Sequence, residues 1–325
     1  MRTAVLKALR STDGYISGQS ICDALDVSRT AVWKDIKKLK EEGYDIESVS
    51  NRGYRLKSAP DILEEHELYS IVDTKWAGRE IHFFEETDST NIKAKQYAEE
   101  GCKNGTLVIT ENQTAGRGRR GRNWISPIGA NIAMTLVLKP DFEPKSAAMV
   151  TLVTAMACAA AINKVYEVDA KIKWPNDIVL DGKKVIGILT EMSAEIDYIN
   201  YLVVGVGINV HPQDFAPEIK EIAGAIESDG IETHRRSELV CEFLREFERY
   251  YDVFCETQDL RNLKREYERL LVNIGKQVKV LDPKEPFEGK ARGITDTGEL
   301  IVDTWDKTMA ISSGEVSVRG LYGYV

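Results

Sequence analysis

Hydrophobic and polar residues follow different patterns in three successive stretches of the chain. Residues 1–60 combine short amphipathic helical segments with a hairpin pattern, and residues 61–271 contain clustered strand-like runs between a few helical runs. Residues 272–325 are again rich in short strand-like runs separated by Gly turns. The pattern therefore predicts three domains with these bounds, in a chain long enough for two or three domains.

The first stretch has the element order of a winged helix-turn-helix domain. Helical patterns at Arg2–Arg10 and Ser17–Leu25 precede a third helix, in which apolar residues recur at i, i+4 and i+7. Ser28 can cap this helix, and a hairpin that turns at Asn51-Arg52-Gly53 would form the wing. The alternative is a small helical domain with a solvated basic face. The residues expected to contact DNA are Ser28, Arg29, Thr30, Lys34, Lys37 and Arg52.

Strand-like runs cluster in the central stretch rather than alternate with helices, which predicts an α+β fold with a mixed or antiparallel sheet. Helical runs are expected at Asn91–Gly101, Ala147–Val165 and Arg236–Leu271. The second is uncharged over Ala147–Ile162 but short for a membrane span, so we expect a buried core helix and no membrane. The last stretch predicts a small β-barrel. Central strands are expected at 81–86, 106–110, 131–139, 171–174, 177–180, 184–192 and 198–210.

The composition, the cysteine spacing and the charge distribution indicate where the protein acts and which part of it binds nucleic acid. Hydrophobic residues make up 43% and charged residues 29% of the chain, as in an ordinary soluble protein. The five cysteines have no C-x-x-C spacing, and the first residues lack the apolar run of a signal peptide, so we expect a cytoplasmic protein with reduced thiols. The net charge of −9 hides an asymmetry, because residues 1–60 have 11 Lys and Arg against 8 Asp and Glu. A basic head on an acidic body indicates that only the head meets nucleic acid.

The densest chemical signal is GRGRRGRNW, from Gly116 to Trp124, which fits three kinds of anion site. Its glycines satisfy G-x-G-x-x-G, but Glu111–Ala115 separates them from the preceding strand and no helix follows, which excludes a dinucleotide fingerprint. A nucleic-acid patch is disfavoured because the loop lies in the acidic body. Glycines allow close backbone approach and arginines give bidentate donors, so a clamp for a small phosphorylated ligand is favoured. Such a loop should be mobile until it binds its ligand.

Other polar motifs occur at strand ends. Thr87–Asn91 lies between a strand and a helix start, and Lys173–Asp177 puts charged, aromatic and carboxylate groups in one turn. Lys183-Lys184 enters an apolar strand, where a lysine is costly without an anion, and Gly205–Asn209 places glycines in another strand. The sequence has no Ser/His/Asp triad pattern, no H-E-x-x-H, no Walker A and no ligand spacing among its four histidines.

These motifs together resemble those of the biotin protein ligases: GRGRRGRNW, KWPNDI and GVGIN, with DSTN upstream and a lysine before GIL. The winged head makes the chain similar to the bifunctional class, the biotin operon repressors that also ligate biotin. The resemblance spans nearly the full length. It implies a winged helix-turn-helix head, a mixed-sheet ligase domain and a small C-terminal SH3-like β-barrel.

The resemblance also implies roles for individual residues. Lys184 and Arg119 would be catalytic, and Lys184 is preferred over Lys183 because the family spacing is lysine, two residues, then Gly-Ile-Leu. Asp177 would meet the Mg²⁺ of Mg-ATP, and the adenine contacts stay open, with Phe215 the one aromatic after His211 in its segment. The implied biotin-binding residues are Ser89, Thr90, Asn91, Gln113, Arg117, Gly118, Arg119, Lys184, Gly187 and Gly205. The implied ATP- and adenylate-binding residues are Gly116, Arg119, Arg120, Arg122, Trp124, Lys173, Asn176 and Asn209.

The implied reaction is formation of biotinyl-5′-AMP from biotin and ATP, followed by transfer of biotin to a lysine of a biotin carboxyl carrier domain, such as that of acetyl-CoA carboxylase. No covalent enzyme nucleophile is needed, which agrees with the missing triad. The adenylate would order the clamp and favour a homodimer that represses biotin genes by binding operator DNA. Three alternatives remain: a ligand-sensing regulator without ligase activity, a lipoate-type ligase, and a ligase whose head no longer binds DNA.

Overall fold

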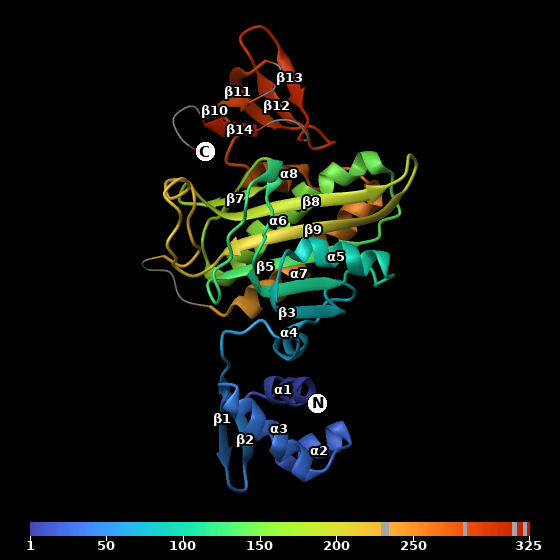
Figure 1. The fold of residues 1–325 in the computed structure, drawn as a ribbon, viewed down its shortest axis with the longest axis vertical. Helices are drawn as coiled ribbons and strands as arrows, with labels where there is room; N and C mark the ends of the chain where they lie inside the picture. The colour runs from blue at the N-terminus through green and yellow to red at the C-terminus, as the bar shows by residue number, and fades with distance from the viewer. Residues whose placement is uncertain (229–233, 282–284, 314–316, 321–323) are drawn as a thin grey trace.

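The computed structural model describes residues 1–325 except 229–233, 282–284, 314–316 and 321–323. Its long axis passes through three units: a small head that contains the N-terminus, a central sheet with helices on both faces, and a β-rich unit at the far end (Figure 1). The fold class is therefore α+β, as predicted. The exact domain boundaries near residues 60 and 272 stay predictions.

The head is a three-helix unit with a wing, and it has its own hydrophobic core. Ser17 and Ser28 cap the second and third helices, and the Ser28 hydroxyl accepts the N–H of Ala31 at 3.2 Å. Val32, Ile36 and Leu39 are buried in the head core, as their spacing predicts. The elements are α1 Arg2–Arg10, α2 Gly18–Leu25, α3 Arg29–Glu41, β1 Asp45–Val49 and β2 Gly53–Ser58, the last two paired antiparallel.

The central unit is built on a seven-stranded mixed sheet with the order β3-β4-β5-β9-β8-β7-β6. β3 and β4 pair in parallel, and the other neighbours pair antiparallel. The expected strands are all present, with ends that shift by a few residues. Their bounds are β3 Ile81–Thr87, β4 Leu107–Gln113, β5 Asn131–Leu138, β6 Lys171–Lys173, β7 Asp177–Leu180, β8 Lys183–Ala194 and β9 Ile199–Asn209.

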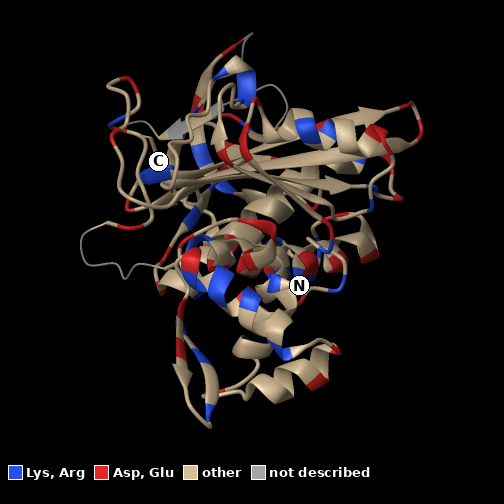
Figure 2. Ribbon diagram, turned by 60° about the horizontal axis from the view of Figure 1, so that its bottom comes forward, with Lys and Arg blue, Asp and Glu red and all other residues tan. Residues whose placement is uncertain are grey.

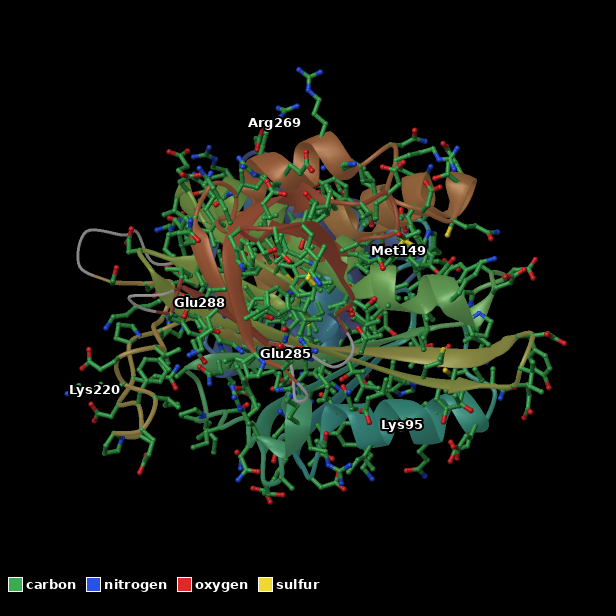
Figure 3. The ribbon with its side chains drawn as sticks, turned by 90° about the horizontal axis from the view of Figure 1, so that it is seen from above. Lys95, Met149, Lys220, Arg269, Glu285 and Glu288 are labelled. Carbon is green, nitrogen blue, oxygen red and sulfur yellow. The ribbon has the colours of Figure 1, made fainter. Side chains whose placement is uncertain are left out.

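Helices cover the two faces of the sheet differently. α5, Thr90–Glu99, packs on β4, β5 and β9, whereas α6, Ala147–Tyr166, and α7, Arg236–Thr257, pack together behind the sheet. Seen from above, Lys95 on α5 and Met149 on α6 lie on opposite sides of the sheet (Figure 3). On the α5 side of the sheet, the part of β8 and β9 next to α5 is covered by the loop that follows β4. The remaining helical elements are α4 Glu65–Ile71, α8 Lys264–Leu270 and the short turns Arg119–Gly121 and Pro144–Ser146.

One helix prediction needs correction. The run Arg236–Leu271 is two helices, because Gln258 adopts a left-handed conformation with φ of 57° that ends α7. After the head, α4 begins at Glu65, and the carboxylate of Asp61 before it accepts from Arg236. The apolar segment Pro144–Tyr166 is long and apolar enough to cross a membrane, yet 78% of its most apolar window is buried within the described protein.

The C-terminal unit is a five-stranded antiparallel sheet in the order β13-β12-β11-β10-β14. Alternate residues of these strands, such as Val278 and Val280, belong to the same continuous hydrophobic core as the central sheet. The unit is therefore packed against the central domain rather than attached by a loose linker. Its strands are β10 Gln277–Leu281, β11 Phe287–Ile294, β12 Leu300–Asp303, β13 Thr308–Ile311 and β14 Ser317–Gly320.

The head contacts α4 through several polar side chains, and the carboxylate of Glu67 on α4 accepts hydrogen bonds from both the head and the body. This side chain is fully buried, and Arg10 of the head donates to its two oxygens at 2.8 and 2.9 Å. Tyr44 of the head donates at 2.7 Å, and Arg235, just before α7, donates at 2.9 Å. Charged donors from both units thus meet on one acceptor.

Candidate active site

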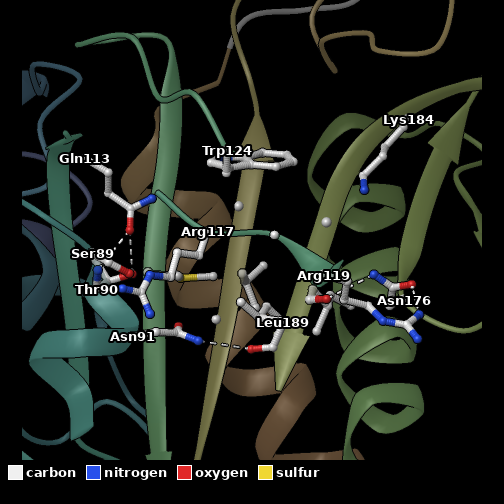
Figure 4. A pocket seen from close by; sticks show the side chains of 17 residues that line it. Ser89, Thr90, Asn91, Gln113, Arg117, Arg119, Trp124, Asn176, Lys184 and Leu189 are labelled. Atoms are coloured by element: carbon white, nitrogen blue, oxygen red, sulfur yellow. Dashed lines mark hydrogen bonds between the residues drawn. The ribbon is translucent and has the colours of Figure 1, made fainter. Parts of the chain in front are cut away.

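A narrow cavity of about 50 Å³ lies on the exposed face of β8 and β9, between the start of α5 and the loop after β4 (Figure 4). Ligand pockets usually have roughly 300–1,000 Å³, so a ligand can enter only if the side chains over this cavity move. The structure brings together all ten residues expected to bind biotin. The lining residues are Ser89, Thr90, Asn91, Gln113, Arg117, Gly118, Arg119, Trp124, Met134, Asn176, Lys184, Gly187, Ile188, Leu189, Gly205, Val206 and Gly207.

The GRGRRGRNW loop folds back on itself as a short hairpin over the cavity. Gly118 N–H donates to Arg122 at 2.7 Å, and Trp124 N–H donates to Gly116 at 2.9 Å. A Cβ added at Gly116 would lie 2.3 Å from the carbonyl oxygen of Trp124, so only glycine allows this close return. Arg119 reaches inward from the loop and donates to the amide oxygen of Asn176 at 2.8 Å.

The start of α5 forms the polar end of the cavity. Gln113 Oε1 accepts from the backbone N–H of Thr90 at 2.9 Å and from its hydroxyl at 3.1 Å. Asn91 accepts from Thr135 at 2.7 Å and donates to Glu191 at 2.8 Å. These side chains are therefore held in fixed orientations before any ligand binds, which lowers the entropic cost of recognition.

Trp124 roofs the cavity, and two glycines form the floor beneath it. Gly187 and Gly207 are direct partners across the β8–β9 pair. A Cβ at Gly207 would lie 2.4 Å from the indole of Trp124, and one at Gly187 would lie 3.0 Å from it. The indole N–H of Trp124 is buried and has no hydrogen-bond partner among the described residues. A buried donor without a partner is unfavourable, so this N–H is available to an acceptor on a ligand.

Lys184 forms an ion pair with Asp177 at the opposite end of the cavity. The Nζ of Lys184 lies 2.6 Å from Asp177 Oδ1, and the Nζ of Lys173 lies 3.9 Å from Asp177 Oδ2. Burial alone would raise the pKa of Asp177, but the charges of Lys184 and Lys173 and a hydrogen bond from Tyr324 outweigh it and lower this pKa. The carboxylate is thus ionised and holds the Lys184 ammonium until another anion competes.

Some expected nucleotide-binding residues lie outside the cavity wall. Arg120 and Arg122 are exposed, and Gly116 is buried at the base of the hairpin, where it pairs with Trp124. Lys173 lies behind Asp177, and Asn209 donates to the carbonyl of Gly224 at 3.0 Å. Of that set, Arg119, Trp124 and Asn176 line the cavity.

Several lining residues were not anticipated from the sequence. Alternation along a strand could have indicated Leu189, because it shares a face with Gly187. Gly207 lies in the glycine motif Gly205–Asn209 that the sequence had indicated. Met134 comes from β5, and its place depends on sheet order, which no local pattern gives. Phe215 does not line the cavity, so the adenine contacts stay open.

The predicted metal position has one carboxylate and no cluster. Among the described residues no group of three or more His, Cys, Asp or Glu side chains is placed to hold a metal ion. Magnesium is usually held by one or two carboxylates together with substrate phosphates, and a single carboxylate at Asp177 is compatible with that donor set.

The predicted DNA-contact residues are all on the surface of the head. Basic and acidic segments alternate along the wing, and basic positions occur on the head helices (Figure 2). Arg52 lies 4.1 Å over the ring of Tyr15, and Arg29 donates to Gln19 at 2.9 Å. Trp33 on α3 is 55% exposed. The sequence analysis did not include it among the DNA-contact residues, although its position among basic residues of the same helix could have indicated that it belongs to this surface. The exposed set is Ser28, Arg29, Thr30, Lys34, Lys37 and Arg52.

Comparisons with known proteins agree with this geometry. Residues 83–209 match the family described as the biotin/lipoate A/B protein ligase family. Residues 2–55 match an HTH domain, and residues 274–319 match the biotin protein ligase C terminal domain. Fold and cavity thus define a biotin/lipoate-type protein ligase with a helix-turn-helix head.

Full-length relatives narrow this class. The chain is 38% identical over 306 residues to the bifunctional ligase/repressor BirA of Bacillus subtilis, with 94% of each protein covered. It is 29% identical over 315 residues to BirA of Escherichia coli, with 97% of this chain and 96% of that protein covered. The chain belongs to the family of bifunctional ligase/repressor BirA proteins. Among solved structures, biotin protein ligase from Aquifex aeolicus in complex with biotin and ATP is 29% identical, has a TM-score of 0.65, and aligns over 74% of this chain and 99% of that chain.

Proposed function

We propose that this chain is an ATP-dependent biotin protein ligase whose adenylate-bound homodimer also represses biotin genes. The observation that carries the ligase proposal is the cavity itself. It places the Lys184 ammonium, the Arg119 guanidinium and the polar start of α5 around one space roofed by Trp124. That is the set of groups needed to hold a carboxylate, a phosphate and a neutral polar ring together.

In the first step a carboxylate oxygen of biotin attacks the α-phosphorus of ATP. The new C–O–P bond forms as the bond to the bridging oxygen breaks, and pyrophosphate leaves with the electron pair. Two anions must approach each other, so Lys184 and Arg119 offset their repulsion within a site that Trp124 shields from water. Ser89, Thr90, Asn91 and Gln113 would hold the polar atoms of the biotin ring.

Mg²⁺ would lie at Asp177, where it would neutralise charge on the phosphate oxygens. The carboxylate of Asp177 is paired with Lys184, so Asp177 would hold the ion once Lys184 has moved to the ligand. Arg117 and Arg119, the loop arginines that line the cavity, would hold the adenylate after pyrophosphate has left.

In the second step the ε-amine of a lysine of the carrier domain attacks the carbonyl carbon of the adenylate. An amide bond forms, the bond to AMP breaks, and the amine loses a proton. The loop must exclude water in the interval, and the bond between Arg119 and Asn176 closes it over the site. The partner is a biotin carboxyl carrier domain of a carboxylase in the cytoplasm.

The repressor function uses the head. Adenylate binding orders the body for homodimerisation, and two heads then contact two operator half-sites. The exposed basic residues of α3 and of the wing support DNA binding by this surface. Sedimentation of the adenylate-saturated protein tests the coupling, and a monomer on operator DNA would contradict it.

The ligase proposal is tested with Lys184→Ala, using Lys183→Ala as a matched control. Pyrophosphate release from biotin and ATP should fall by about a hundredfold or more in Lys184→Ala, because an interaction with transition-state charge is lost. Lys183 is exposed at the strand start, and its removal should leave the rate unchanged. A full adenylation rate in Lys184→Ala would refute the assignment.

A further inference from the structure

Tyr324 contacts Asp177, which lies next to the cavity-lining residue Asn176. Tyr324, the penultimate residue, donates its hydroxyl to Asp177 Oδ2. Its ring faces the Nζ of Lys173 at 3.8 Å. The C-terminus accordingly lies between the end of the β-rich unit and β7 (Figure 1).

The two oxygens of Asp177 have different partners. Oδ1 faces Lys184 at 2.6 Å, whereas Oδ2 accepts from Tyr324 and lies 3.9 Å from Lys173. Asp177 is buried, with 8% of the residue exposed, so it cannot exchange a lost partner for water. Removal of a partner from a buried charge is costly unless other donors remain.

We propose that Tyr324 is a positioning residue for the ligase reaction, whose hydroxyl holds Asp177 so that Lys184 can leave this carboxylate for the ligand. The inference rests on the proposed role of Lys184. When Lys184 turns to the carboxylate of biotin, Asp177 keeps the hydroxyl of Tyr324 and the nearby charge of Lys173. Without that hydroxyl, the Asp177 carboxylate has one donor fewer, so its ion pair with Lys184 is costlier to break. The ligand carboxylate then binds the Lys184 ammonium with lower affinity.

The same geometry gives the β-rich unit a direct part in the site. Arg119 of the loop donates to the carbonyl of Ser313 at 2.5 Å, at the edge of the C-terminal unit. The C-terminal unit therefore makes two contacts at the end of the cavity that lies opposite the start of α5, one with Arg119 and the other with Asp177. Loss of the tail contact alone should then alter ligand affinity without loss of the fold.

The test variant is Tyr324→Phe, which removes the hydroxyl and keeps the ring over Lys173. Calorimetric titration with biotin alone, without ATP or Mg²⁺, should show a Kd about tenfold higher, as expected for loss of a hydrogen bond to a charged group. In pyrophosphate release the KM for biotin should rise by a similar factor, while kcat stays within about twofold. Tyr198→Phe is the matched control, since Tyr198 is 58% exposed at the β8–β9 turn, and it should change neither value.

A second variant separates positioning from packing. In an Asp177→Asn background, Tyr324→Phe should have no further effect on biotin affinity, because the carboxylate through which it acts is gone. An unchanged Kd in Tyr324→Phe, or an equal loss in the Asp177→Asn background, would overturn the proposal. So would a lowered unfolding midpoint with kcat and KM both changed, which indicates a structural role. A fully active Lys184→Ala would instead show that the proposed role of Lys184 has failed.

Discussion

Glu67→Gln should loosen the joint between head and body while the shape of the side chain is preserved. The carboxylate is fully buried, and four donor groups on Arg10, Tyr44, Arg235 and Ser237 converge on it. Loss of one member of a buried ion pair costs about 3–5 kcal/mol. The arginine side chains are 18% and 26% exposed, so water relieves part of this cost and we expect a loss of about 3 kcal/mol.

Hydrogen–deuterium exchange measures this loss in the helices α1–α3, because exchange reports the free energy of local opening. Protection there should fall by about a hundredfold, since roughly 1.4 kcal/mol corresponds to a factor of ten. Pyrophosphate release should be unchanged, because Glu67 does not line the cavity. Glu41→Gln is the control, since its pair with Lys37 is 3.8 Å long with side chains 64% and 61% exposed, and its loss should cost below about 1 kcal/mol. If both variants exchange like the wild type, the buried carboxylate does not hold the joint.

Three further predictions concern the site and its surroundings. Arg119→Ala should release biotinyl-AMP about tenfold faster in rapid filtration, because a charge-assisted hydrogen bond that closes the loop is lost, and an unchanged release rate would contradict this. Gly205→Ala should weaken biotin binding about tenfold by calorimetry, since its Cβ would lie 2.2 Å from Asn91 Oδ1 and overpack a fixed side chain; an unaltered Kd would show that Asn91 can shift freely. Burial lowers the pKa of His211, but hydrogen bonds to two carboxylates outweigh it and raise this pKa above 6.5. The stability that His211 contributes should therefore be full below pH 6.5 and be lost as pH rises through the raised pKa. The difference in unfolding free energy between the wild type and His211→Gln should then become smaller as pH rises. A difference that does not change with pH would refute this prediction.

The sequence predicted most of the local structure because local signals act over a few residues. The cap at Ser28 and the buried face of α3 follow from spacing within one helix, and both are confirmed. The break at Gln258 was missed because a left-handed residue there has no glycine to signal it. The ion pair between Asp61 and Arg236 could not be predicted either, because the two residues lie far apart in the chain.

The candidate site could be predicted as a set of residues but not as a geometry. Motif spacing selected Lys184 over its neighbour, and the structure places Lys184 in the cavity wall. The same motifs did not show that Asp177 forms an ion pair with Lys184. That pairing depends on how β7 lies against β8, a contact set by the register of the sheet.

By itself, the sequence determined the three kinds of domain, the loop of arginines and glycines, and the positions of the polar motifs, because each is encoded by neighbours in the chain. Only the tertiary structure decided that Gly187 and Gly207 lie opposite each other under Trp124. It also decided that Tyr324, near the end of the chain, meets Asp177 in the middle. Such contacts join residues that are distant in sequence, and they form only when strands pair and domains pack around a shared core.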